Sequence, residues 1–191
     1  MGEPRAIVLD ACVLYARIPR RIVLGVAERG LIAPLWSARI LDEWRIAAHR
    51  KGGDIAEIRR ATGAMQIRWP DACLPPSPER EAAIALPDPN DAHVLAITVG
   101  EAPQILTFNL RDFPRHVLAG HGVEAIHPDG FLWLLFSEHP EEVGAVIADM
   151  AADDDARTAQ EQRRLLKRAR LPRLGKAVEA ARSGPAYSSK A

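Results

Sequence analysis

The chain has 191 residues with 25 basic and 25 acidic side chains, so its formal net charge at pH 7 is zero. This length is typical of one domain that buries a sizeable core, with room for an appendage, and the zero net charge excludes a molecule that is basic overall. The two cysteines lack the spacing of a zinc or redox motif, no apolar run approaches the roughly 18 residues of a transmembrane helix, and the N-terminus does not resemble a signal peptide. We therefore expect a cytoplasmic protein that makes no contact with a membrane.

The first part of the chain alternates between predicted strands and helices. The uniformly apolar residues 6–9 predict a strand that is buried on both faces of a parallel sheet. Apolar residues at helical spacing predict a helix over 19–30, and residues 31–37 form a short strand or connection. Ser37 is suited to cap the next helix, which should end at Gly52.

The rest of the chain continues this alternation, except for the proline-rich residues 70–80, which we expect to be loop. Helices are predicted over 54–69, 88–100, 127–136 and 140–152 and in the basic tail, with strands at 104–109 and 123–126. Strands separated by helical segments indicate the α/β class, with a mostly parallel central sheet in a sandwich of helices.

The charge of the chain changes sign near residue 156. Residues 129–156 hold eight Asp or Glu and no Lys or Arg, whereas residues 157–182 hold nine Lys or Arg and two Glu. This shift predicts a core domain over 1–150, followed by a basic helical extension over 151–191.

Four acidic side chains are predicted to meet at one edge of the sheet. Asp10 directly follows the first strand, and Asp112 follows the strand at 104–109. Asp91 and Glu43 lie early in two of the predicted helices. Because ligands of open α/β sheets bind beyond the carboxyl ends of the strands, this edge is the expected functional site.

Carboxylates gathered in this way need a compensating charge or a proton. Two of them about 5 Å apart repel by roughly 3 kcal/mol at an effective dielectric near 20, and either raised pKa values or a divalent cation would offset that repulsion. Mg²⁺ and Mn²⁺ prefer oxygen ligands, so such a site suits hydrolysis of a phosphodiester bond by a metal-activated water. Simpler roles stay open, because Asp88 before Pro89 also fits a helix N-cap. Asp91 would then complement the helix dipole, and Glu43 would be a solvated helix residue.

Five motifs along the chain resemble those of the PIN domain family of nucleases. They are VLDACVLY (8–15), WSARILDEW (36–44), PDPNDAHVLA (87–96), ILTFNLRDFP (105–114) and HPDGFLWLL (127–135), in the order and at the spacing of the family. The chain is most similar to the bacterial PIN proteins related to VapC-type toxins. The resemblance implies a three-layer α/β/α fold and a ribonuclease that depends on Mg²⁺ or Mn²⁺.

The resemblance also implies roles for particular residues. The catalytic acids are Asp10, Glu43, Asp91 and Asp112, the metal ligands among them are Asp10, Asp91 and Asp112, and the supporting residues are Asn109, Asp88 and Arg39. Asp88 is assigned to the helix cap first, with a metal or supporting role as the alternative. Arg39 lies one helical turn before Glu43, where it steadies that carboxylate, touches a phosphate or forms a plain surface ion pair.

The implied partners are an RNA substrate and a small antitoxin protein of a type II toxin–antitoxin pair, with a homodimer left open. The alternative function is a non-catalytic PIN-fold module that binds RNA or a protein. Many family members carry a hydroxyl residue shortly after the first acid, where this chain has Ala11 and Cys12, so we expect a lost hydrogen bond that Cys12 replaces only weakly. The basic tail either binds an RNA backbone or folds on the acidic stretch EEVGAVIADMAADDD (141–155), and we favour the second arrangement.

Overall fold

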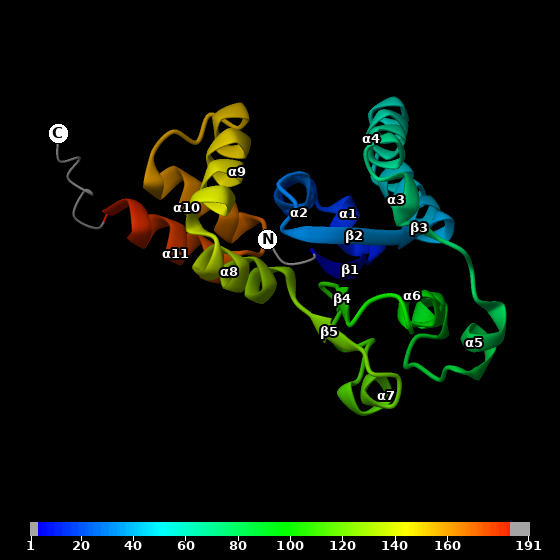
Figure 1. The fold of residues 1–191 in the computed structure, drawn as a ribbon. Coiled ribbons are helices and arrows are strands. Elements are labelled where there is room, and N and C mark those ends of the chain that lie inside the picture. The colour runs from blue at the N-terminus through cyan, green and yellow to red at the C-terminus, as the bar shows by residue number, and fades with distance from the viewer. Residues whose placement is uncertain (1–3, 184–191) are drawn as a thin grey trace.

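The computed structural model describes residues 4–183 and is organised around one sheet of five parallel strands in the order β3-β2-β1-β4-β5 (Figure 1). The strands are β1 (Arg5–Leu9), β2 (Ile32–Ser37), β3 (Cys73–Leu74), β4 (Gln104–Leu106) and β5 (Glu124–Ile126). β1 lies at the centre, and its residues Ile7, Val8 and Leu9 are fully buried. The predicted α/β class and the predicted central strand are therefore confirmed.

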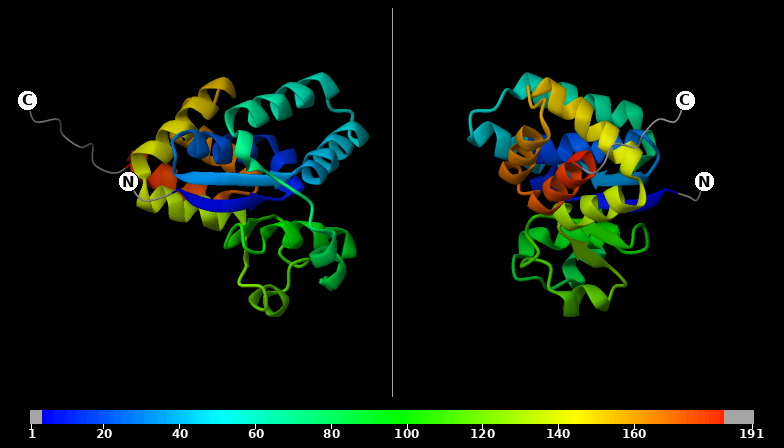
Figure 2. Two further views of the ribbon diagram at one scale, coloured as in Figure 1. Left: turned by 45° about the vertical axis from the view of Figure 1, so that its right-hand side comes forward. Right: turned by 90° about the vertical axis from the view of Figure 1, so that its left-hand side faces the viewer.

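Helices cover both faces of the sheet, which makes a three-layer sandwich (Figures 1 and 2). They are α1 (Ala11–Tyr15), α2 (Arg17–Glu28), α3 (Ala38–Arg50), α4 (Ile55–Arg68), α5 (Pro78–Ala83), α6 (Ala92–Thr98), α7 (Arg115–Ala119), α8 (Pro128–Glu138), α9 (Pro140–Asp153), α10 (Ala159–Arg168) and α11 (Pro172–Ser183), with 3-10 turns η1 (Pro70–Ala72) and η2 (Pro89–Asp91). In both figures α5, α6 and α7 lie on one side of the sheet, and the other helices lie on the opposite side. None of the helices within residues 4–183 combines the length and the apolar character needed to span a bilayer.

The proline-rich segment departs most from the sequence prediction, because it is not simply a loop. Cys73 and Leu74 form the edge strand β3, which pairs with Trp36 and Ser37 of β2. Two residues are too few to produce an alternating pattern, so no strand was predicted here. The short helix α5 begins with Pro78 in its first turn, a position that proline favours.

The C-terminal helices pack into the same core as the sheet. Leu166, Leu171 and Leu174 are fully buried and belong to the hydrophobic cluster that contains β1. The backbone N–H groups of Arg173 and Leu174 both donate to the carboxylate of Asp129 at 3.0 Å, which fixes the start of α11 beside the start of α8. The expected boundary at residue 150 falls inside α9, and the division into two parts stays a prediction.

The acidic segment forms its ion pairs mainly with α2, not with the basic tail that we expected to fold on it. Arg29 of α2 pairs with Asp149 at 3.2 Å, and Arg21 pairs with Asp154 at 3.6 Å. Within residues 4–183, the only ion pair that joins the acidic segment 129–156 to the tail is the local contact of Arg157 with Asp155. Charge complementarity along the sequence does not reveal which helices pack together. Helix α9 packs on α2, whereas the tail helix α11 packs on α8, where Asp129 accepts two of its backbone N–H groups.

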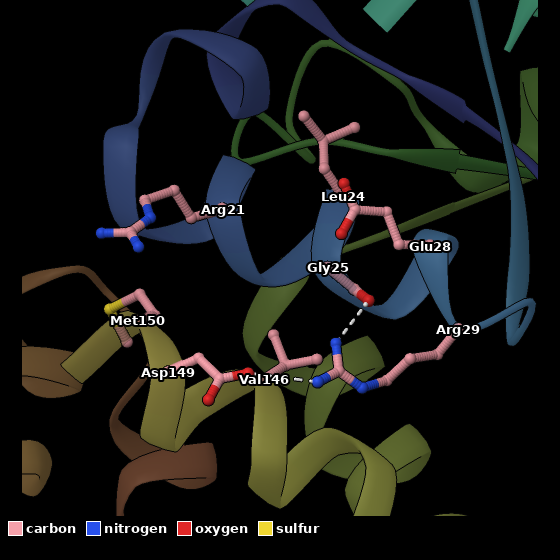
Figure 3. Close-up of a pocket in the computed structure, with 8 residues that line it drawn as sticks. All are labelled: Arg21, Leu24, Gly25, Glu28, Arg29, Val146, Asp149 and Met150. Carbon is pink, nitrogen blue, oxygen red and sulfur yellow. Dashed lines mark hydrogen bonds and ion pairs between the residues drawn. The ribbon is translucent and has the colours of Figure 1, made fainter. Parts of the chain in front are cut away.

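Helices α2 and α9 approach closely where Gly25 faces Val146 (Figure 3). A Cβ atom added at Gly25 would lie 2.7 Å from Cγ1 of Val146, so a larger side chain forces one of the two helices to move. A pocket of about 290 Å³ lies beside this contact, where Arg29 donates at 3.2 Å to the carbonyl oxygen of Gly25 and at 3.2 Å to Asp149. None of the four predicted catalytic acids lines this pocket, which lies between the packed helices α2 and α9.

We expect Gly25→Ala to lower the free energy of unfolding by roughly 1–2 kcal/mol, because the overpacking exceeds the gain in helix propensity. Val146 cannot easily turn away, since a β-branched side chain has one preferred rotamer in a helix. In a Val146→Ala background the same substitution should be neutral or stabilising. Urea unfolding of the four proteins measures this coupling, and an equal effect of Gly25→Ala in both backgrounds would contradict it.

Candidate active site at the carboxyl edge of the sheet

Asp10 is the buried acid of the candidate site. It follows β1 directly, its backbone N–H donates to the carbonyl oxygen of Leu106 at 3.1 Å, and it is 7% exposed. Although it stands at the N-cap of α1, its side chain makes no capping bond. Its Oδ2 atom instead accepts hydrogen bonds from the Thr107 hydroxyl at 2.6 Å and from the Cys12 thiol at 2.9 Å. These two donors hold the carboxylate across the gap between β1 and β4.

Thr107 is the site residue that sequence reasoning missed. The register that places Leu9 beside Leu106 brings Thr107 next to Asp10, and its side chain is fully buried. Its hydroxyl also accepts a hydrogen bond at 3.0 Å from the backbone N–H of Asn109, so one oxygen connects the acid to the turn after β4. The available signal was a lone polar residue at the end of an apolar strand that pairs with the strand before Asp10.

Cys12 supports Asp10 more fully than we expected. Its thiol donates to Asp10 and accepts the backbone N–H of Phe108 at 3.2 Å. Burial, aided by the nearby negative charge of Asp10, raises the pKa of Cys12 far above its usual value, so the thiol keeps the proton that it donates. The hydroxyl that the sequence lacks after Asp10 is thus supplied by Thr107 from the neighbouring strand, with Cys12 as a second donor.

Glu43 reaches the same edge because of the way in which α3 begins. The side chain of Ser37, the last residue of β2, accepts the backbone N–H of Ile40 at 3.3 Å, as predicted for an N-cap. The first turns of α3 therefore lie at the carboxyl end of the sheet, and Arg39 and Glu43 share one helix face. Glu43 is half-buried there.

Arg39 connects three segments around Glu43. Its guanidinium donates to Glu43 Oε1 at 3.3 Å, to Glu81 Oε1 of α5 at 2.7 Å and to the carbonyl oxygen of Asn90 at 3.1 Å. The contact with Glu43 that the sequence suggested is present, and the two other contacts tie the proline-rich segment and η2 to α3. The side chain of Arg39 is 45% exposed, so its net contribution to stability is modest.

His93 of α6 is a second neighbour of Glu43, and the sequence did not predict it. Its Nε2 atom lies 2.9 Å from Glu43 Oε1, and the residue is 4% exposed. The ring does not direct an N–H at that oxygen, and neither ring nitrogen has a hydrogen-bond partner within residues 4–183. His93 and Arg39 also line a pocket of about 250 Å³ that adjoins the acids.

The sequence left open whether Asp88 and Asp91 cap a helix or bind a ligand, and the structure gives the two residues different roles. The Asp88 side chain accepts the backbone N–H of Asn90 at 2.9 Å and therefore caps η2, as we assigned first. Asp91 stands at the N-cap position of α6, but its side chain makes no capping bond and accepts no hydrogen bond within residues 4–183. The carboxylate of Asp91 is therefore available to bind a ligand.

Four acids lie close enough to Asp91 for their negative charges to affect its pKa. Burial raises the pKa of Asp91 to about 7, and the negative charges of Asp10, Asp88, Asp112 and Glu43 add to the effect in that order. Asp91 is half-buried, and a carboxylate responds to neighbours of like charge only when they lie near it in a region of reduced dielectric. The structure thus brings Asp10, Glu43 and Asp112 close enough to Asp91 for their negative charges to raise its pKa.

Asp112 and Asn109 come from the turn that follows β4. The backbone N–H of Asp112 donates to the carbonyl oxygen of Asn109 at 3.0 Å, and the buried ring of Phe113 anchors the turn. Asp112 is half-buried, whereas Asn109 is exposed. Both side chains are thus carried by a turn that Thr107 fixes to Asp10.

The donor atoms of this site fit a hard cation by their chemistry. The converging groups are carboxylate oxygens, which Mg²⁺ and Mn²⁺ prefer. As the side chains lie, however, no group of three or more His, Cys, Asp or Glu residues within 4–183 forms a ready metal site. The spacing of the acids is therefore wider than that of a formed metal centre, although their charges are coupled.

Comparison with known proteins finds one partial similarity. The chain is 43% identical over 61 residues to a protein of Mycobacterium tuberculosis named "Putative ribonuclease VapC50". The matched part covers 31% of this chain and 36% of that protein, so the chain spans about a third of the length of its relative. No family model matches the chain, and no solved structure matches it.

The raised pKa of Asp91 predicts a pH dependence of stability in the absence of divalent ions. Between pH 3.8 and about 7 the folded protein keeps a proton on Asp91 that the unfolded chain has lost, so the free energy of unfolding should fall as the pH rises through this window. Asp91→Asn should remove this part of the slope and be more stable than the wild type above it. Urea unfolding at about pH 5 and about pH 8 with a chelator tests this, and identical slopes in the two proteins would refute it.

The hydroxyl of Thr107 should be more important than its volume. Thr107→Val keeps the shape but removes the donor to a buried carboxylate, which should cost about 1–3 kcal/mol of stability. Thr107→Ser keeps the hydroxyl, so it should lose less than the valine variant despite its missing methyl group. Thermal or urea unfolding of both variants decides the point, and a serine variant less stable than the valine variant would show that packing dominates.

Proposed function

We propose that this protein is a ribonuclease that hydrolyses RNA phosphodiester bonds with the help of Mg²⁺ or Mn²⁺. The single observation that carries the proposal is the gathering of acids around the half-buried, uncapped Asp91 at the carboxyl edge of the parallel sheet, where burial and nearby carboxylates raise its pKa to about 7. Such a concentration of negative charge at the carboxyl edge of a parallel sheet costs stability unless a cation neutralises it. The partial similarity to a protein named as a ribonuclease supports the same activity.

In this proposal Asp10, Asp91 and Asp112 hold the divalent ion. A bound ion of this kind lowers the pKa of a coordinated water and stabilises the negative charge on the leaving oxygen. The Thr107 hydroxyl and the Cys12 thiol fix one oxygen of Asp10, which reduces the reorganisation needed when a substrate binds. With a pKa of about 7, Asp91 is partly protonated near neutral pH and would give up that proton to act as a ligand of a cation.

Glu43 and its neighbours have a different task. Arg39 donates to Glu43 and to two other segments, so it fixes the direction of that carboxylate relative to α5 and η2. Glu43 is thereby set to orient the attacking water rather than to bind the ion as strongly as Asp10 does. Asn109, exposed on the turn after β4, is placed to contact the RNA backbone.

The resemblance to the PIN family and the name of the partial relative extend the proposal to a biological role. We propose that the chain is the toxin of a type II toxin–antitoxin pair, in which a small protein restrains the ribonuclease. A gene for such a partner next to the gene for this chain, and a complex of the two proteins without nuclease activity, are the observations that support this role.

The activity is tested by incubating the protein with a mixed RNA pool in Mn²⁺, with a chelator as the negative control. Asp10→Asn and Asp91→Asn should abolish cleavage, because each removes a charged ligand of the proposed ion. Asp88→Asn should retain most activity, because asparagine caps helices about as well as aspartate. Unchanged cleavage in both of the first two variants would place the active site elsewhere, and RNA binding without cleavage in the wild type would favour the non-catalytic alternative.

A further inference from the structure

A basic surface surrounds the turn between α10 and α11. We call it the basic strip and define it as Lys167, Arg168, Arg170, Arg173 and Lys176, all of which are exposed. None of the five forms an ion pair within residues 4–183, and residues 162–178 contain no Asp or Glu. The nearest ion pair in sequence joins Arg163 to Glu179, so none of the five side chains of the strip is neutralised by an ion pair within the described residues.

The basic strip is anchored beside the candidate active site by aromatic contacts. The guanidinium of Arg170 lies 4.5 Å from the centre of the Phe108 ring, and Phe108 stands between Thr107 and Asn109 in the chain. The guanidinium of Arg173 lies 3.5 Å from the centre of the Trp133 ring in α8. Through Phe108, which follows β4, the strip begins at the carboxyl edge of the sheet, and its other members lie on the C-terminal helices α10 and α11.

An arginine that stacks on an aromatic ring is well suited to bind a phosphate. The ring fixes the guanidinium plane, while the N–H groups at its edge stay free for hydrogen bonds. Within residues 4–183, neither the Arg170 nor the Arg173 guanidinium donates a hydrogen bond to the protein. Both are thus ordered cations with unused donors.

Helix electrostatics explains only part of this charge pattern. Lys167 and Arg168 lie in the last turn of α10, where positive charge is favourable. Arg173 lies in the first turn of α11, where the helix dipole disfavours a cation, and this turn contains no acid of its own. Asp129 of α8 supplies the missing negative group by accepting two backbone N–H groups there. The fold thus compensates for a positive charge that α11 alone does not favour.

We propose that the basic strip binds the phosphate backbone of single-stranded RNA and directs the strand to the acids at the sheet edge. This inference rests on the proposed ribonuclease function and adds the surface by which the substrate is held. The acids by themselves repel a polyanion, so a neighbouring cationic surface is needed for the RNA to approach them. The contacts would be with phosphates, so the strip should not select a base sequence.

The test is a triple variant, Lys167→Gln, Arg168→Gln and Lys176→Gln, which leaves the two stacked arginines and all buried groups in place. The matched control is Arg50→Gln, Arg59→Gln and Arg60→Gln on α3 and α4, which removes the same charge from other exposed positions. Binding of a labelled single-stranded RNA is measured in chelator at several salt concentrations, so that no cleavage intervenes. Cleavage by the same proteins is measured separately in Mn²⁺.

The strip variant should bind RNA roughly tenfold to a hundredfold more weakly, and its salt slope should be shallower by up to about 2, since each lost contact with a single strand contributes about 0.7. Its KM should rise while kcat stays near the wild-type value. Wild-type affinity in the strip variant, or an equal loss in the control, would overturn the proposal.

The result also separates this inference from the proposed function. If the strip variant alone loses binding but no protein cleaves RNA in Mn²⁺, the binding surface stands and the nuclease proposal falls. If the wild type cleaves RNA and the strip variant binds and cleaves it equally well, the nuclease proposal stands and the binding surface falls.

Discussion

The hydrogen bond from Thr107 to Asp10 is the interaction on which the arrangement of the site depends. It joins the end of the central strand β1, which the buried acid follows, to the end of its neighbour β4, which the Asn109 turn follows. The same hydroxyl accepts the N–H of Asn109, so the position of Asp10 and the direction of the chain after β4 are set by one oxygen atom. Because this oxygen is buried, water cannot replace either contact without cost. The remaining acids, Glu43, Asp91 and Asp112, lie at an edge of the sheet where the position of Asp10 is already fixed.

That edge is electrostatically unfavourable, and the rest of the molecule has to compensate for it. The repulsion around Asp91 is tolerated because β1 and the helices on both faces bury a continuous apolar core. Arg39 provides partial relief, since it places a permanent positive charge beside Glu43 and connects α3 to α5 and η2. A divalent cation bound at this edge would remove a penalty that the folded chain otherwise carries, so an arrangement of this kind would favour a cation-bound state.

Much of the framework follows from local sequence patterns, whereas the contacts across it do not. The apolar run before Asp10, the Ser37 cap and the cap formed by Asp88 are short-range signals, and the structure contains all three. The edge strand β3 is too short to have a period, and Thr107 becomes significant only when the pairing of β1 with β4 is known. His93 looked like an ordinary helix residue until α6 was placed against Glu43. The ion pairs of α9 with α2 were not predicted, because opposite charge along a sequence does not identify which helices pack together.

Because α11 is attached through Asp129, the acidic edge and the basic strip form at different times during synthesis. All the acids of the sheet edge lie between residues 10 and 112, whereas the basic strip lies between residues 167 and 176. Chains fold from the N-terminus during synthesis, and the two N–H groups that Asp129 accepts belong to residues made 44 and 45 positions later. A nascent chain therefore carries the acidic edge before the cationic surface beside it exists. During that interval the growing protein exposes negative charge to the surrounding ribosomal RNA, and the positive charge of residues 167–176 is added only later.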